Sequence, residues 1–185
     1  MRNRAVSFLT RLLFPWTCQK CDNLLGPSEQ SICQICLATL PSVGPTEQWK
    51  LAALASSINA NSRATLLNTS DVSILCYSLK YGKNFPLARA LGFWKMGQTL
   101  LEYPNFKQRN GPTLLVPMPT SWRRAWKRGY NQSEQLAKGI RRRMRREGVQ
   151  SDIAPLLEKV EHRRSQIHFG PHERWGNARD AVRAR

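Results

Sequence analysis

Two pairs of cysteines near the start of the chain constrain its fold more than any other feature. Cys18 and Cys21 form one C-x-x-C pair, and Cys33 and Cys36 form a second, with 11 residues between the pairs. Each pair can present two thiolates to one tetrahedral ion, and paired knuckles of this kind are typical of structural zinc sites. Because the protein would fill all four ligand positions, the spacing predicts a structural Zn²⁺ and not a catalytic one.

Two other interpretations of these cysteines stay open on the residues alone. Four thiolates also hold iron or an iron–sulfur cluster, and a C-x-x-C pair can be a redox motif. Zinc is favoured because paired knuckles more often hold it, and because neither pair sits at a predicted strand-to-helix step. The fifth cysteine, Cys76, lies within an apolar run, so we expect a buried thiol that acts as a small hydrophobe.

The distribution of apolar residues predicts two folded units. The cysteine segment, residues 18–36, has too few apolar residues to fold unaided, so a metal would supply the missing stability. We predict a helix over residues 5–14 and a four-cysteine zinc module within residues 1–42. A connector of weak structural signal follows over 43–70, and residues 71–185 form a second domain.

Charge and hydropathy indicate the cellular compartment of the protein and the chemical class of its partner. Lys and Arg outnumber Asp and Glu by 29 to 12, so the expected partner is anionic: nucleic acid, a phosphorylated metabolite or an acidic protein. Arg11 interrupts the opening apolar stretch before a signal-like run develops. No window approaches the roughly 18 apolar residues of a membrane span. We therefore expect a cytoplasmic protein whose thiols stay reduced.

The second domain shows an alternation of strand and helix patterns. Residues 71–79 are β-rich and apolar on both faces, which predicts a strand in a covered sheet, and residues 86–102 have helical spacing. Residues 113–116 predict a second strand. A second helix opens at Asn131, a predicted N-cap, and after Val149 the pattern predicts no further strand. This order predicts an α/β domain with a parallel sheet.

The capping pattern and core face of that second helix can also be predicted. Glu134 follows Asn131 by three residues, as in a capping box, and the apolar face would bury Leu136, Ile140 and Met144.

A proline loop and a basic loop lie between the second strand and the second helix. In open α/β sheets ligands bind beyond the carboxyl ends of strands, and helix N-termini favour anions. The segment is therefore typical of a phosphate or pyrophosphate site, where Gly129 would let the backbone approach the ligand. Charge alone leaves open the alternative of a solvated cationic surface. The candidate cations are Arg123, Arg124, Lys127 and Arg128.

Several short motifs accompany the cysteine pairs along the chain. They are Leu-Lys-Tyr at 79–81, Val-Pro-x-Pro at 116–119, Arg-Gly-Tyr-Asn-Gln at 128–132 followed by Leu-Ala, and Gln166, Glu173-Arg174 and Asn177. Together with the cysteine pairs, these motifs resemble the ComF family of competence-associated proteins. The resemblance covers most of residues 14–182. It implies a zinc module fused to a type I phosphoribosyltransferase-like domain. It also implies a role in DNA uptake during natural transformation, alongside a helicase-like partner.

The resemblance also implies a ligand site for a molecule like phosphoribosyl pyrophosphate. Residues 163–177 would be the mobile hood that covers this ligand. The implied ligand-binding residues are Lys80, Pro117, Pro119, Arg128, Gly129, Asn131, Gln132 and Arg174.

One part of the family pattern is missing from this chain. The family's two acidic residues and Thr/Gly-rich turn, which cradle the 5-phosphate and ribose, do not occur, and only five residues follow Asp180. We therefore expect a truncated domain that lacks its last strands and exposes a sheet edge, which favours aggregation unless a partner covers it. Enzymatic activity is left open, phosphoribosyl transfer by this chain alone is not expected, and Mg²⁺ would belong only to an intact parent protein.

A second hypothesis is a zinc-dependent module that binds single-stranded DNA or another nucleic acid without enzymatic activity. Its backbone contacts would come from the cations of the basic loop together with one dense basic run that contains Arg141, Arg142, Arg145 and Arg146. Trp122, Trp126 or Tyr130 would stack on bases, although ordinary core or loop packing is the more common role of such aromatics.

Overall fold

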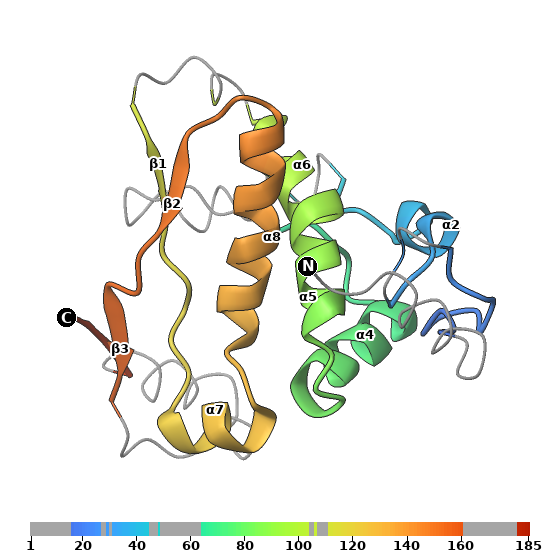
Figure 1. Cartoon of the computed structure of the whole chain (residues 1–185), viewed down its shortest axis with the longest axis horizontal. Coiled ribbons are helices and arrows are strands. Elements are labelled where there is room, and N and C mark those ends of the chain that lie inside the picture. Colours follow the sequence, from blue (N-terminus) through green and yellow to red (C-terminus); the bar gives the residue numbers. More distant parts are fainter. Residues whose placement is uncertain are drawn as a thin grey trace, which may run out of the picture.

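The computed structural model describes residues 16–26, 29, 31–44, 48, 64–103, 106, 111–160 and 181–185. These residues form a mixed α/β structure, as the sequence predicts, with helices beside a small parallel and a small antiparallel sheet (Figure 1). The predicted helix over 5–14 lies outside the described residues. In chain order the elements are α2 (Gln34–Ala38), α4 (Ser70–Tyr81), α5 (Phe85–Leu91), the π-helical turn η2 (Gly92–Met96), α6 (Gly97–Leu101), β1 (Thr113–Leu115), α7 (Trp122–Arg128), α8 (Gln132–Arg146), β2 (Ser151–Ile153), β3 (Leu157–Lys159) and β4 (Val182–Ala184).

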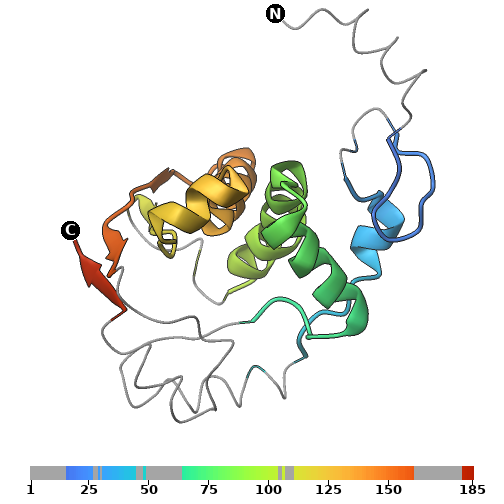
Figure 2. The same ribbon diagram turned by 90° about the horizontal axis from the view of Figure 1, so that it is seen from below.

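The elements lie side by side in a series of layers (Figures 1 and 2). The parallel pair of strands packs against α8, and α8 packs in turn along α5, η2 and α6. Helix α4 contacts the other side of α5, and the cysteine segment with α2 lies beyond it. The cysteine segment and the strands are therefore at opposite ends of the described structure.

The parallel sheet confirms one prediction and corrects another. Strand β1 pairs in parallel with β2, in a register that sets Thr113 opposite Ser151 and Leu115 opposite Ile153. The connection between them runs through α7 and α8, which is the long crossover that parallel strands require. Strand β2 and the antiparallel pair β3–β4 correct the expectation that no strand follows Val149. These strands have three residues each, too few to produce a readable periodicity.

Residues 71–79 form most of helix α4, so the prediction of a strand there was wrong. Thr69 is the N-cap, and its Oγ1 accepts a hydrogen bond from the backbone N–H of Val72 at 3.5 Å. The buried side chains are Val72, Leu75 and Leu79, at the i, i+3 and i+7 spacing of one helical face. Cys76 points to the other side and is exposed, which corrects its predicted burial.

The predicted helix over 86–102 is confirmed by α5, η2 and α6, which run on without a break. This helix crosses α8 with backbone in contact with backbone. A Cβ added at Gly92 would lie 2.2 Å from the carbonyl oxygen of Leu136, and one at Gly139 would lie 2.2 Å from that of Arg89. Glycine is required at both positions because any side chain would push the two helices apart.

Helix α8 begins as predicted. The Oδ1 atom of Asn131 accepts a hydrogen bond from the N–H of Ser133 at 3.1 Å, and Met144 is fully buried. Leu136 and Ile140 are only half-buried. Glu134 pairs with Lys138 one turn further on, at 2.6 Å between Oε1 and Nζ.

The buried apolar residues of the cysteine segment and of the helices form one continuous cluster. Cys18, Cys36 and Leu37 belong to the same cluster as Leu75 and Leu87. Burial of each large side chain such as Leu87 contributes about 1.5–3 kcal/mol relative to exposure. The helices therefore depend on the cysteine segment for part of their apolar cover.

Candidate functional site

The four predicted metal ligands come together in space. One Sγ atom from each of Cys18, Cys21, Cys33 and Cys36 lies within 4.8 Å of all the others, and Cys21 Sγ and Cys33 Sγ are 3.8 Å apart. Four thiolates at about 2.3 Å from a tetrahedral ion lie roughly 3.8 Å from one another. The donor set therefore fits a tetrahedral metal ion such as zinc, with all four positions supplied by the protein.

Two short turns position the cysteines. In the first turn, Thr17 and Leu24 form an antiparallel bridge, and Asp22 adopts a φ of 56° that reverses the chain. In the second, Cys33 is the N-cap of α2 and Cys36 lies in its first turn. Each turn thus presents a pair of sulfur atoms to the same point.

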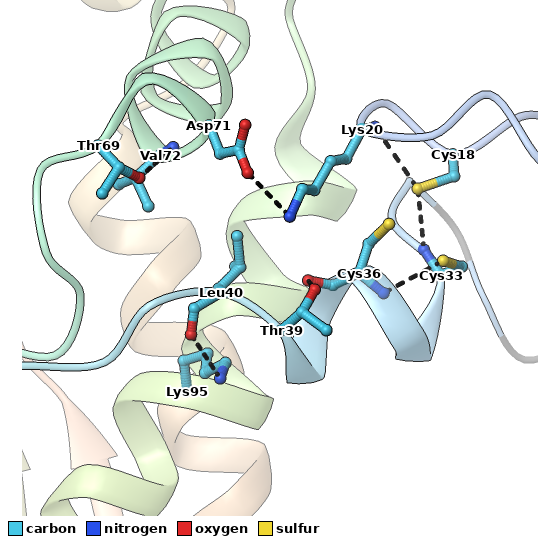
Figure 3. Close-up of polar contacts among 10 residues, drawn as sticks. All are labelled: Cys18, Lys20, Cys33, Cys36, Thr39, Leu40, Thr69, Asp71, Val72 and Lys95. Atoms are coloured by element: carbon cyan, nitrogen blue, oxygen red, sulfur yellow. Dashed lines mark hydrogen bonds and ion pairs between the residues drawn. The ribbon is translucent and has the colours of Figure 1, made fainter.

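Backbone N–H groups point at two of the sulfur atoms (Figure 3). The N–H groups of Lys20 and Cys33 donate to Cys18 Sγ at 3.5 and 3.3 Å, and the N–H of Cys36 donates to Cys33 Sγ at 3.4 Å. Burial raises the pKa of the Cys18 thiol, but hydrogen bonds from the backbone of Cys33, Lys20 and Cys21 and from the Cys21 side chain outweigh it and hold that pKa at about 7. The Cys18 thiolate is therefore accessible at neutral pH, as metal binding requires.

Cys36 differs from Cys18 in its surroundings. Burial, together with the neighbouring cysteine side chains, raises the pKa of the Cys36 thiol above its ordinary value. A bound cation would offset this burial, because a coordinating thiol is deprotonated by the ion itself. Without a cation the Cys36 side chain is favoured as the neutral thiol.

Hydrogen bonds with side chains of the neighbouring helices hold the cysteine segment in place (Figure 3). Lys95 of η2 donates through Nζ to the carbonyl oxygens of Ala38 and Leu40, at 3.3 and 3.4 Å, where α2 ends. Burial lowers the pKa of Lys95. Ser31 Oγ donates to Oδ1 of Asn84, the N-cap of α5, at 2.9 Å. The metal ligands are thus held against α5 and η2 by polar contacts as well as by the apolar cluster.

The proline loop after β1 lies beside the N-terminus of α8. Asn131 Nδ2 donates to the carbonyl oxygen of Met118 at 3.1 Å. Within the loop Pro117 is buried and Pro119 is half-buried. The predicted arrangement of a strand end, a stiff loop and a helix N-terminus is therefore present.

The turn over residues 128–132 also contacts the end of α4. Tyr130 Oη and Gln132 Nε2 both donate to the carbonyl oxygen of Leu79, at 2.6 and 3.2 Å, next to the exposed Lys80. Arg128 Nη1 donates to Gln132 Oε1 at 3.2 Å. The structure thus gathers the predicted ligand residues of α4, the proline loop and the turn. Arg174 and the predicted hood lie outside the described residues.

The predicted basic loop is a helix. Residues 122–128 form α7, and Gly129 ends it with a left-handed φ of 80°. A Cβ at Gly129 would meet nothing within 4 Å. Glycine serves here to terminate the helix, and the expectation that it lets a ligand approach the backbone stays a prediction. In α7, Trp126 is 85% exposed, and the Arg123 guanidinium lies 5.5 Å from the ring centroid of Trp122.

A basic groove of about 660 Å³ lies between α2 and α8. Its lining contains all four predicted nucleic-acid residues, Arg141, Arg142, Arg145 and Arg146. Arg89, Lys138 and Trp94 also line it and were not among the predicted residues. The available signal was the spacing of the α8 cations at 138, 141, 142 and 145, which places them on one helical face.

Comparisons of this chain with protein-family models, with curated proteins and with solved structures found no match. Among the helices that the structure describes, none has the length and apolar character needed to cross a membrane.

Proposed function

We propose that this chain is a ComF-like protein that assists DNA uptake in natural transformation. Its phosphoribosyltransferase-like domain would bind a phosphorylated ligand without catalysing transfer. The observation that carries the proposal is the convergence of three motifs of the resemblance. The end of α4 before Lys80 and the proline loop at Met118 both accept hydrogen bonds from the turn over 128–132.

The chemistry of this region suits phosphate. The first N–H groups of α8 have no partners within the helix and favour an anion near the N-terminus, while Lys80 and Arg128 supply positive charge. Catalysis needs more than this, because the leaving pyrophosphate must be positioned and its charge stabilised. The sequence has no Asp-Asp pair that would hold Mg²⁺. A binding role is therefore favoured over an enzymatic one.

The remaining parts of the proposal concern the metal and the setting. We assign structural Zn²⁺ to the four cysteines, since the ligand set is closed and composed of thiolates. A reducing cytoplasm would keep these thiols available for the metal. The proposed partners are single-stranded DNA and a helicase-like protein of the uptake machinery.

Two measurements test the proposal. Calorimetry of the zinc-loaded chain should detect binding of phosphoribosyl pyrophosphate, and Lys80→Ala should weaken it at least several-fold. Arg146→Gln, which removes an exposed cation from the other end of α8, is the matched control and should bind as the unchanged protein does. In a transformable bacterium that lacks its own ComF-like gene, this gene should restore DNA uptake. Absence of both ligand binding and restoration would refute the proposal.

A second candidate function is a zinc-dependent nucleic-acid-binding module without enzymatic activity. The observation that favours it is the position of the four arginines at 141, 142, 145 and 146, which line a groove and do not scatter over the surface. Single-stranded DNA should then bind with a steep salt dependence, with a slope of about −0.7 per phosphate contact in a log–log plot. A small ligand at the turn over 128–132 would give a shallow slope.

A further inference from the structure

The α2–α8 groove has one floor and two walls. The floor is formed by α5 and η2, which lie between α8 on one side and α2 on the other (Figures 1 and 2). Residues of α8 supply one wall, and Ile32, Gln34 and Leu37 of the cysteine segment contribute to the other. The volume of about 660 Å³ is in the range of sites that hold a small molecule. The metal centre thus shapes one wall of the groove.

The α8 wall carries a concentrated positive charge. In the described part of the chain, Lys138 pairs with Glu134, whereas no ion pair is formed by Arg141, Arg142 or Arg145. Arg89 adds a further cation from the floor. The guanidinium groups of Arg141 and Arg145 are therefore available to an anionic ligand, whereas Nε of Arg89 already donates to Gln135 Oε1 at 2.8 Å.

Among the residues that the structure describes, the acidic residue in the groove lining, Glu29, forms no ion pair with these cations. Glu29 Oε2 accepts the N–H of Gly26, and Oε1 accepts the N–H of Gln34, each at 2.7 Å. Both oxygen atoms are thus held by the cysteine segment itself. These two hydrogen bonds lower the pKa of Glu29, so the carboxylate stays ionised and orders the wall opposite α8.

An aromatic ring lies beside the cations. Trp94 of η2 lines the groove and is 39% exposed, whereas its neighbour Phe93 is 8% exposed. The two rings pack edge to face with centroids 4.8 Å apart, and the Arg143 guanidinium lies 6.0 Å from the Trp94 centroid. The indole is therefore held in place with part of its surface open. Such a ring next to arginines is the arrangement on which nucleobases stack.

We propose that the α2–α8 groove binds a nucleotide unit, with its phosphate on Arg141 and Arg145 and its base on Trp94. The proposal rests on the second candidate function and assigns its ligand chemistry. Guanidinium groups match phosphate oxygens in a bidentate manner, and stacking tolerates any base. A free nucleotide and one unit of a single strand share this chemistry. An acidic peptide would use the cations but would gain little from the indole.

Binding is measured by fluorescence anisotropy with the zinc-loaded full chain and a labelled oligo-dT of twelve nucleotides. The double variant R141Q/R145Q should bind at least tenfold more weakly and show a shallower salt slope. The matched control K83Q/R185Q, which removes the same charge from exposed positions outside the groove, should change affinity less than twofold. Competition with unlabelled dTMP and ATP then shows whether a free nucleotide or a strand is the preferred source.

Substitutions of tryptophan test the stacking. Trp94→Leu should weaken binding about tenfold or more, consistent with the energy of one stacked base. Trp94→Phe should retain most of the affinity, and Trp126→Leu on α7 should retain all of it. Circular dichroism establishes that each variant is folded before its affinity is compared.

The possible outcomes distinguish an error in the groove assignment from an error in the second candidate function. If the unchanged protein binds DNA but R141Q/R145Q and K83Q/R185Q weaken binding equally, the groove assignment is wrong while nucleic-acid binding stands. Polyglutamate is compared with the oligonucleotide at the same concentration of negative charges. If it displaces the oligonucleotide and Trp94→Leu has no effect on affinity, the groove holds an acidic peptide and the proposal fails. If the protein binds neither DNA nor nucleotides, both the groove assignment and the second candidate function fail.

Discussion

Lys20 Nζ lies 2.9 Å from Asp71 Oδ2, and this ion pair joins the first cysteine turn to the first turn of α4 (Figure 3). Asp71 is favourably placed for its own helix, because a carboxylate near the N-terminus complements the helix dipole. The pair spans 51 positions of the sequence, so it connects the metal ligands to a helix that is remote in the chain. Together with the shared apolar cluster, it couples the metal centre to the helices.

Metal removal should therefore unfold more than the cysteine segment. Structural Zn²⁺ contributes about 10 kcal/mol or more in isolated zinc-finger peptides at pH 7. A loss of only about 3 kcal/mol lowers Tm by roughly 6–12 °C in a chain of this size. We expect one cooperative transition by circular dichroism at 222 nm that shifts to lower temperature after chelation. If the helical signal kept its Tm while metal was lost, the coupling would be absent.

The Lys20–Asp71 pair makes a prediction at alkaline pH. The hydrogen bond to Asp71 is the largest influence on the pKa of Lys20 and raises it above the ordinary value of 10.5. Because the folded-state pKa is the higher one, the stabilisation is fully present below 10.5 and is lost as the pH rises through the raised value. The difference in urea midpoint between the unchanged protein and Lys20→Met should be constant from pH 7 to 9 and should shrink above pH 11. A difference that closed by pH 8 would contradict this assignment.

Gly139→Ala should destabilise the protein strongly. The added Cβ would lie 2.2 Å from the carbonyl oxygen of Arg89 and 2.9 Å from the backbone nitrogen of Phe93, so α5 and η2 would have to move away from α8. Overpacking of this kind costs about 1–3 kcal/mol or more. In an exposed helix the same change would stabilise by up to about 1 kcal/mol. The sign of the change in unfolding free energy, measured in urea, therefore decides whether the two backbones are in contact.

Tyr130→Phe should reduce stability modestly. The change removes the hydrogen bond from Tyr130 Oη to the carbonyl oxygen of Leu79 and leaves that acceptor with Gln132 Nε2 as its remaining donor. A hydrogen bond of this kind contributes about 1 kcal/mol. We expect a small fall in the urea midpoint and no change in oligonucleotide affinity, since Tyr130 does not line the α2–α8 groove. A large loss of affinity would place this residue in the nucleic-acid site.

Local signals explain what the sequence predicted correctly. The cysteine spacing predicted a four-thiolate cluster because each pair needs only one tight turn to present both sulfur atoms. Asn131 predicted the start of α8 because an N-cap depends on hydrogen bonds within a few residues. The strand over 113–115 was predicted correctly, because its apolar β-rich run ends at the prolines that follow.

The errors arose where tertiary packing decides between local alternatives. Val72 and Ile74 have strand-favouring side chains, yet the helical face of α4 packs against α5 and leaves Ile74 59% exposed. The cap at Thr69 was the signal for a helix and was not used. The groove was missed for another reason: Trp94 and Arg141 line it from different helices, and no one-dimensional pattern contains that arrangement.

The reactivity of the cysteines offers a direct test of the metal centre. Of the five cysteines, Cys76 lies on the exposed side of α4, whereas Cys21 is exposed but belongs to the ligand cluster. A thiolate bound to an ion reacts slowly, so the zinc-loaded protein should show one fast thiol towards a disulfide reagent, and Cys76→Ser should show none. Chelation should release all the remaining thiols together, because the four sulfur atoms share one ion. Two fast thiols before chelation would mean that Cys21 is not a ligand, and the ligand set would then have an open position.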